Sequence, residues 1–250
     1  MTKVLLIQVR AQDDGMSTHE IDCIHRRLVG RQYSLVTYNA VVHRATPTWL
    51  DGCDALIIGG SGDFSVHHPK SRPWVDPLHR VIEAALARNL PGFGICFGHQ
   101  LLGEHLGAVV RTAPEHSEMG TVDIQLTDHG RQDELFSDFD STFPVHTGHS
   151  DCVSTVPVGV DCLASNLRLS TQAFRVRGTR FYSVQFHPDM SGAEARARYL
   201  AYKEGFAERL DESALKFAER FQLERDVSTR LMGRFLDLVQ LDASHGVPKK

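Results

Sequence analysis

The segment with the clearest chemical potential is Gly94-Ile95-Cys96-Phe97-Gly98. A short apolar stretch, residues 92–95, predicts a buried strand that ends at Cys96, with a glycine two residues before and two residues after the cysteine. This G-x-C-x-G pattern is the thiol version of the nucleophile elbow, a sharp strand-to-helix turn at the carboxyl end of a sheet. The turn places the sulfur at a helix N-terminus, which favours the reactive thiolate. An isolated cysteine is usually a buried small hydrophobe, but the flanking glycines favour a nucleophile.

A cysteine nucleophile needs a base and a group that orients the base. The chain holds fourteen histidines, so only sequence context distinguishes them. His187 follows a predicted strand and precedes Pro188, which favours a turn, and Asp189, whose carboxylate can accept a hydrogen bond from the imidazole. Without the elbow, this segment could equally be a loop histidine beside a solvated aspartate. With the elbow, it supplies the histidine and the carboxylate that Cys96 needs.

The first half of the chain predicts the elements that would position these residues. Short apolar stretches rich in β-branched residues alternate there with amphipathic helical patterns. The predicted strands are residues 3–9, 33–38, 54–58 and 92–95, and the predicted helices are residues 17–28 and 76–89. Such alternation with nearly all-apolar strands is typical of a parallel sheet that helices cover on both faces.

The second half predicts a different arrangement. Short strands with turns are expected at residues 108–110, 120–126, 142–145, 172–176 and 180–184, with Gly178 at a positive-φ position in a hairpin turn. They would form an antiparallel extension of the sheet, so residues 1–195 are predicted to be one α/β domain. Residues 196–250 are predicted to be a C-terminal helical extension packed on that domain, with a helix restarting near 211–213 and a frayed end at 244–250.

Two motifs together resemble the class I, triad-type glutamine amidotransferases, in particular stand-alone units of the GMP-synthase-glutaminase type. They are G-x-C-x-G-H-Q at residues 94–100 and Q-F-H-P-acid at residues 185–189. The resemblance covers roughly residues 1–195 and implies a flavodoxin-like, mostly parallel central sheet flanked by helices. It also implies that Cys96 is the nucleophile, His187 the base and later the acid, and Asp189 the orienting carboxylate. The family usually has Glu at the last position, so Asp189 is one methylene shorter.

The same resemblance suggests further site residues. The turn at residues 59–62 is similar to the family's glycine-rich oxyanion loop, so the backbone N–H groups of Gly60 and Phe97 would stabilise the tetrahedral oxyanion. Gln100 matches the glutamine that helps to hold the substrate. The segment at residues 148–151 resembles the one whose backbone recognises the α-amino and carboxylate groups of the substrate, through His149, Ser150 and Asp151.

The resemblance implies hydrolysis of the γ-amide of glutamine through a γ-glutamyl thioester. The residues after 195 are too few for an ATP-dependent synthetase, so a separate synthetase subunit is a possible acceptor of the ammonia. Two alternatives stay open. The chain could hydrolyse γ-glutamyl peptides or γ-glutamyl polyamines, which present the same α-amino acid head, or it could be a catalytically weak regulatory or binding subunit on the same fold.

Composition excludes several other classes of protein. The 27 Lys and Arg residues are scattered, and against 31 Asp and Glu residues they give a net charge of −4, so no nucleic-acid surface is predicted. No apolar stretch approaches the ~18 residues of a membrane span, and the N-terminal apolar stretch is too short for a secretory signal. Five cysteines without a C-x-x-C pair suggest free thiols and a cytoplasmic location.

Neither a metal nor a cofactor is predicted. His67 and His68 are adjacent, and His146 and His149 are close in sequence, but no carboxylate or cysteine completes a set of ligands beside either pair. The chain also lacks the G-x-x-x-x-G-K-[ST] phosphate-binding loop. The resemblance to the glutamine amidotransferases implies instead a small-molecule substrate, glutamine or another γ-glutamyl compound.

Overall fold

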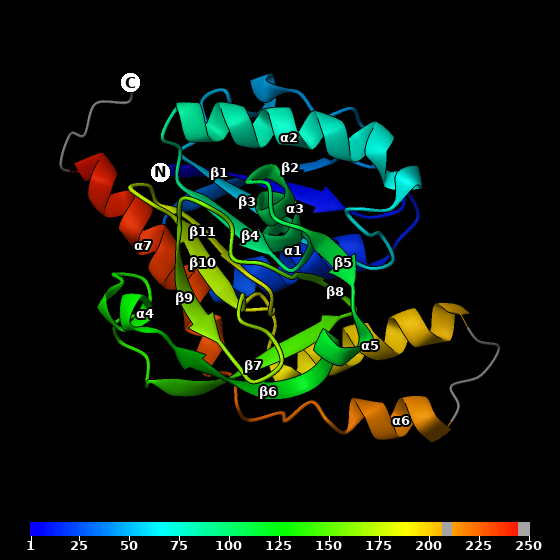
Figure 1. The fold of residues 1–250 in the computed structure, drawn as a ribbon. Coiled ribbons are helices and arrows are strands. Elements are labelled where there is room, and N and C mark those ends of the chain that lie inside the picture. The colour runs from blue at the N-terminus through cyan, green and yellow to red at the C-terminus, as the bar shows by residue number, and fades with distance from the viewer. Residues whose placement is uncertain (207–211, 245–250) are drawn as a thin grey trace.

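The computed structural model describes residues 1–206 and 212–244, and its centre is a nine-stranded sheet (Figure 1). The strand order is β2-β1-β3-β4-β11-β10-β9-β6-β7. The first five strands of this order pair in parallel: β2 (Tyr33–Asn39), β1 (Thr2–Val9), β3 (Ala55–Ser61), β4 (Gly92–Ile95) and β11 (Phe181–Val184). Because β4 lies between β3 and β11, the carboxyl ends of these three strands meet at one edge of the sheet.

The sheet continues through antiparallel strands. β10 (Ala173–Val176) pairs with β11 and with β9 (Val160–Ser165), and β6 (Glu118–Leu126) pairs with β9 and with β7 (Thr142–His149). A separate ribbon joins β5 (Val110–Thr112) to β8 (Asp151–Val153). This arrangement confirms the predicted fold class, a mostly parallel sheet with an antiparallel extension.

Helices cover both faces of the parallel strands. The helices are α1 (Met16–Arg27), α2 (Arg72–Ala87), α3 (Phe97–His105), α4 (Asp128–Gln132), α5 (Gly192–Phe206), α6 (Glu212–Ala218) and α7 (Arg230–Ser244). Successive residues of β1 point to opposite faces, so Val4 and Leu6 pack with α1 and α7, whereas Leu5 and Ile7 pack with α2 and α3. This two-sided burial explains why the strands are apolar throughout.

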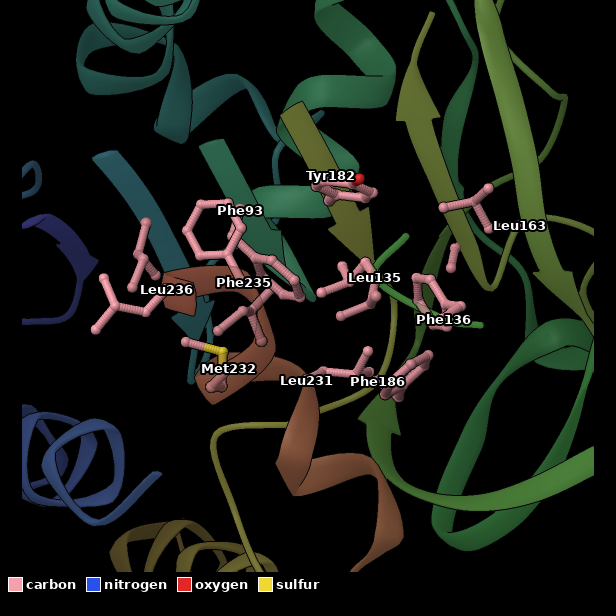
Figure 2. Packing of buried hydrophobic residues seen from close by; sticks show 14 of the residues in the cluster. Phe93, Leu135, Phe136, Leu163, Tyr182, Phe186, Leu231, Met232, Phe235 and Leu236 are labelled. Carbon is pink, nitrogen blue, oxygen red and sulfur yellow. The ribbon is translucent and has the colours of Figure 1, made fainter. Parts of the chain in front are cut away.

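Buried side chains of α7 pack against the central strands of the sheet (Figure 2). The Phe235 ring meets Phe93 of β4 edge-on at 5.3 Å between centroids and Tyr182 of β11 at 6.5 Å, and Met232 and Leu236 extend this contact. Aromatic pairs in this geometry add to the stabilisation that comes from burial.

The division of the chain into two domains at residue 195 stays a prediction.

Some elements differ from those predicted from the sequence. α2 begins at Arg72 rather than at residue 76, because Pro73 occupies the first turn, where a missing N–H costs no intrahelical hydrogen bond. β5 begins two residues later than expected, and β8 and β9 were not predicted. The predicted hairpin turn is confirmed, since Gly178 has a φ of 75°. The predicted helix restart near residues 211–213 agrees with α6, which begins at Glu212. Ser244, the first residue of the predicted frayed end, is the last residue of α7, and Asp211 and residues 245–250 lie outside the described residues.

Figure 1 shows α5 and α6 beside the antiparallel strands β6 and β7 and away from α2, which lies along the parallel strands.

None of the helices within residues 1–206 and 212–244 combines the length and the apolar character needed to cross a bilayer.

Candidate active site

Cys96 sits in a strained turn between β4 and α3. Its backbone has φ 50° and ψ −94°, and within the described residues Asn89 is the only other non-glycine residue with a positive φ. Non-glycine residues in such conformations cost free energy and are concentrated at functional sites. Cys96 lies at the N-terminus of α3 and is buried, with 7% of the residue exposed. These features confirm the strand-to-helix elbow that the sequence predicted.

The two glycines of the motif allow the turn to pack tightly. A Cβ at Gly98 would lie 2.3 Å from the carbonyl oxygen of Ile58 in β3, and a Cβ at Gly94 would lie 2.7 Å from the carbonyl oxygen of Gly98. Both obstacles are backbone atoms, which cannot move aside as a side chain can. A side chain at either position would therefore collide with the neighbouring strand or helix.

His187 and Asp189 form a buried pair just after β11. The imidazole Nδ1 lies 3.0 Å from Oδ1 of Asp189. Burial by itself would lower the pKa of His187, but Asp189 and Cys96 outweigh burial and raise it to about 9. Burial likewise opposes ionisation of Asp189, yet His187 and the guanidinium of Arg198 hold the pKa of that carboxyl well below its usual range. At neutral pH the pair is therefore imidazolium and carboxylate.

Gly60, at the end of β3, brings the main chain against both reactive side chains. A Cβ at this position would lie 2.8 Å from Cε1 of His187 and 3.7 Å from Cβ of Cys96. Since Nδ1 of His187 is hydrogen-bonded to Asp189, Nε2 is the ring nitrogen that remains available to interact with the thiol. Phe97 is the first residue of α3, and the first amides of a helix have no intrahelical acceptor. An oxyanion beside Cys96 could accept hydrogen bonds from such amides.

Gln100 lies one helical turn after Cys96 and is anchored to the neighbouring segment. Its Nε2 donates to the carbonyl of Asp151 at 2.8 Å and lies 3.4 Å from Oε1 of Gln185. Gln185 is itself fully buried, and its Nε2 lies 3.6 Å from Sγ of Cys96. No role was predicted for Gln185, although this residue opens the Q-F-H-P motif. Its amide is a neutral donor that faces the sulfur.

The segment His149–Asp151 lines the same cavity as Cys96, Gln100 and His187. The side chains of His149 and Asp151 already form hydrogen bonds within the protein. Nδ1 of His149 lies 3.0 Å from the Asp151 carbonyl, and the Asp151 carboxylate accepts hydrogen bonds from the hydroxyls of Ser65 and Thr112. The role of this segment in recognising the α-amino acid head of the substrate stays a prediction.

The cavity has a volume of about 460 Å³ and extends well beyond the thiol. Its far wall comes from α5 and from apolar side chains of neighbouring segments. The wall residues include Phe64, Met119, Met190, Arg198, Tyr199, Tyr202, Lys203 and Phe221. None of these residues was predicted from the sequence as a site residue, because no local pattern relates α5 to the elbow.

A strained cysteine beside a histidine–carboxylate pair is the arrangement of a hydrolase that uses a thiol nucleophile. Comparison with known proteins is consistent with that class. The sequence model of the family described as glutamine amidotransferase class-I matches residues 14–204. The chain therefore belongs to the class I glutamine amidotransferase family, and the resemblance recognised in the two motifs is confirmed.

Similar proteins include glutamine-hydrolysing GMP synthases. The chain is 36% identical over 141 residues to the enzyme of Parafrankia sp., covering 56% of this chain and 24% of that protein. It is 27% identical over 188 residues to the enzyme of Porphyromonas gingivalis, covering 75% of this chain and 34% of that protein. The matches thus span about a quarter to a third of the length of these curated relatives.

Solved structures share the fold. A glutamine amidotransferase from Thermotoga maritima superposes with a TM-score of 0.74 at 20% identity, covering 95% of this chain and 97% of the other. A protein from Thermoplasma acidophilum, described as a putative subunit of GMP synthase, superposes with a TM-score of 0.64 at 21% identity, covering 97% of this chain and 98% of the other. At these identities the likeness concerns the fold alone.

Proposed function

We propose that this chain is a glutaminase that cleaves the γ-amide of glutamine through a γ-glutamyl thioester on Cys96. The observation that carries the proposal is the elbow at Cys96, packed against Gly60 and His187, with His187 bonded to Asp189 at 3.0 Å. Membership of the glutamine amidotransferase family supports the same reaction. Asp189 takes the part of the orienting carboxylate, since orienting an imidazole tolerates either acidic residue.

In the first half of the proposed reaction, the Cys96 thiolate attacks the γ-carbonyl carbon and forms a C–S bond. The carbonyl oxygen becomes an oxyanion that accepts hydrogen bonds from the backbone amides of Gly60 and Phe97. His187 then gives its proton to the amide nitrogen, the C–N bond breaks, and ammonia leaves. The enzyme now carries a γ-glutamyl thioester and a neutral imidazole.

In the second half, His187 takes a proton from water, and the hydroxide attacks the thioester carbon. The C–S bond breaks, glutamate leaves, and the thiolate and imidazolium are restored. In this scheme Gln100 and the backbone of His149, Ser150 and Asp151 hold the α-amino acid head of the substrate. Their support is that these residues share one cavity with the thiol.

The ammonia released in this scheme requires an acceptor. The curated relatives are GMP synthases, and one structural neighbour is described as a putative subunit of GMP synthase. We therefore propose that the partner of this chain is a separate synthetase subunit, which receives the ammonia.

We also propose that the protein works in a reducing, cytoplasmic compartment. All five cysteines are free thiols, which supports this location; they are Cys23, Cys53, Cys96, Cys152 and Cys162.

The size of the cavity favours one further candidate function. A volume of about 460 Å³ lies within the range of pockets that enclose drug-sized ligands, and side chains of α5 form part of its wall. A γ-glutamyl peptide or γ-glutamyl polyamine would place its leaving amine against this wall. Such a substrate would undergo the same two half-reactions, with the amine in place of ammonia.

The test compares the wild type with Cys96→Ala and with the control Cys162→Ala, whose thiol donates to the carbonyl of Ser170 at 3.1 Å instead. Each protein is incubated with glutamine, γ-glutamyl-cysteine and a γ-glutamyl polyamine, and the released glutamate is measured. Cys96-dependent release from glutamine supports the glutaminase. Faster release from the larger donors supports the γ-glutamyl hydrolase, and release from no donor supports the catalytically weak binding subunit.

A further inference from the structure

The second oxygen of Asp189 has a partner of its own on α5. Nη1 of Arg198 lies 3.2 Å from Oδ2 of Asp189, while Oδ1 of Asp189 faces His187. The side chains of Arg198 and Asp189 are 6% and 2% exposed, so water screens this ion pair little. The two carboxylate oxygens are thus held by two different side chains, one from each side.

The other edge of the Arg198 guanidinium is fixed by α1. Its Nε and Nη2 lie 3.3 Å and 3.1 Å from Nδ1 of His19. A guanidinium can only donate, so Nδ1 of His19 is an acceptor and the imidazole is neutral. Burial and the adjacent Arg198 both lower the pKa of His19, in agreement with that neutral form. The guanidinium is therefore clamped between a carboxylate and an imidazole.

The start of α5 is fixed as firmly as the guanidinium. Ser191 and Glu194 form a reciprocal capping box, in which the Ser191 amide donates to Oε2 of Glu194 at 2.7 Å and the Glu194 amide donates to the Ser191 hydroxyl at 3.3 Å. Glu194 also pairs with Arg27 of α1 at 3.2 Å. Arg198 lies one helical turn after Glu194, so its position relative to α1 is set by this cap.

We propose that Arg198 is a positioning residue for the reaction: it holds the Asp189 carboxylate in the orientation that places Oδ1 against His187. This inference rests on the proposed function. A short aspartate side chain can rotate its carboxylate away from the imidazole. The hydrogen bond from Nη1 of Arg198 opposes that rotation, because the other guanidinium nitrogens, Nε and Nη2, are held by His19.

Charge balance supports the same role. A thiolate at Cys96, an imidazolium at His187 and a carboxylate at Asp189 would together carry one uncompensated negative charge in a buried site. Arg198 brings the sum to zero, and uncompensated buried charge is strongly destabilising. Arg198 therefore stabilises the charged form of the site as well as its geometry.

The test compares Arg198→Met, which removes the charge and the donors, with Arg198→Lys, which keeps the charge but not the fork. Arg196→Met is the control, because it makes the same change on the same helix. We expect Arg198→Met to lower kcat about 10- to 100-fold, the range for a misplaced reacting group, with KM for glutamine unchanged. Arg198→Lys should lower kcat less, about two- to tenfold, because it keeps the positive charge and lacks only the planar guanidinium. Arg196→Met should match the wild type.

A double-mutant cycle with Asp189→Asn separates a positioning role from general destabilisation. If Arg198 acts through Asp189, the loss caused by Arg198→Met disappears in the Asp189→Asn background. The same loss in both backgrounds, or a change in KM rather than kcat, would overturn the inference. If Arg198→Met does not fold, the kcat of Arg198→Lys tests the positioning role instead. An unchanged kcat in Arg198→Lys would then overturn the inference.

The rate of Cys96 alkylation by iodoacetamide is measured in parallel at pH 7, because it needs no glutamine. We expect alkylation to be slower in Arg198→Met than in the wild type and in Arg196→Met. A wild type that releases no glutamate contradicts the proposed function, whereas equal alkylation rates in all three proteins contradict the role of Arg198. The two failures are therefore distinguishable.

Discussion

Replacing Asp189 by Asn should return His187 to the neutral imidazole at neutral pH. In the wild type, the carboxylate of Asp189, together with Cys96, overcomes the effect of burial and raises the pKa of His187 from 6.5 to about 9. That difference corresponds to about 3 kcal/mol of preference for the imidazolium, since one pKa unit is worth about 1.4 kcal/mol. Without the carboxylate, burial dominates, and the pKa of His187 should fall to its ordinary value or below it.

The change in protonation follows directly. At pH 7.5 a group with a pKa of about 9 is about 97% protonated, and one with a pKa of about 6.5 is about 9% protonated. The population of imidazolium beside Cys96 should therefore fall about tenfold in Asp189→Asn. Turnover should fall further, by about two orders of magnitude or more, because the ring also loses the acceptor that orients it.

The assay is a histidine-ring NMR titration, with the resonance of His187 identified by its absence in His187→Gln. Asp138→Asn is the matched control, since Asp138 is exposed and pairs with Arg234 rather than with a histidine. A pKa of His187 that stays near 9 in Asp189→Asn would refute the reasoning, because another group would then have to stabilise the imidazolium.

Three further predictions concern the same site. Gly98→Ala should destabilise the fold by about 1–3 kcal/mol in a thermal melt, because its Cβ meets the Ile58 carbonyl, whereas Gly15→Ala, where nothing lies within 4 Å, should melt like the wild type. Gly60→Ala should lower kcat about 100-fold by displacing the His187 ring, and an unchanged kcat would show that this contact is not needed. The stabilisation from the His187 imidazolium is complete below pH 6.5 and is lost as the pH rises through about 9, so the melting temperature should fall over that interval, and a flat profile would contradict the assignment.

Most of the parallel core could be predicted from the sequence because its signals are local. The strand at residues 92–95 is confirmed within its predicted bounds, and the elbow follows from glycines two residues to each side of Cys96. The His187–Asp189 contact lies within two residues of chain. In each case the residues that interact are neighbours in the sequence, so their types and spacing carry the information.

The remaining features depend on contacts between distant segments. β9 was not predicted because buried and exposed residues do not alternate along it. The adjacent residues Val160 and Asp161, for example, are both buried. The partner of Arg198 on α1 is His19, 179 residues away, and no local pattern joins them. The start of α5 does have a local signal, because Ser191-x-x-Glu194, directly after the histidine–aspartate turn, is a capping-box pattern that predicts the start of a helix beside the site.

The central claim is that Cys96 carries the γ-glutamyl group during turnover. The most direct measurement is the intact mass of the protein after brief mixing with glutamine and acid quenching, for the wild type and for Cys96→Ala. We expect a mass increase of one γ-glutamyl group in the wild type, located on Cys96 by peptide mapping, and none in the variant. A wild type that releases glutamate while its mass stays unchanged, or an adduct on another residue, would contradict it.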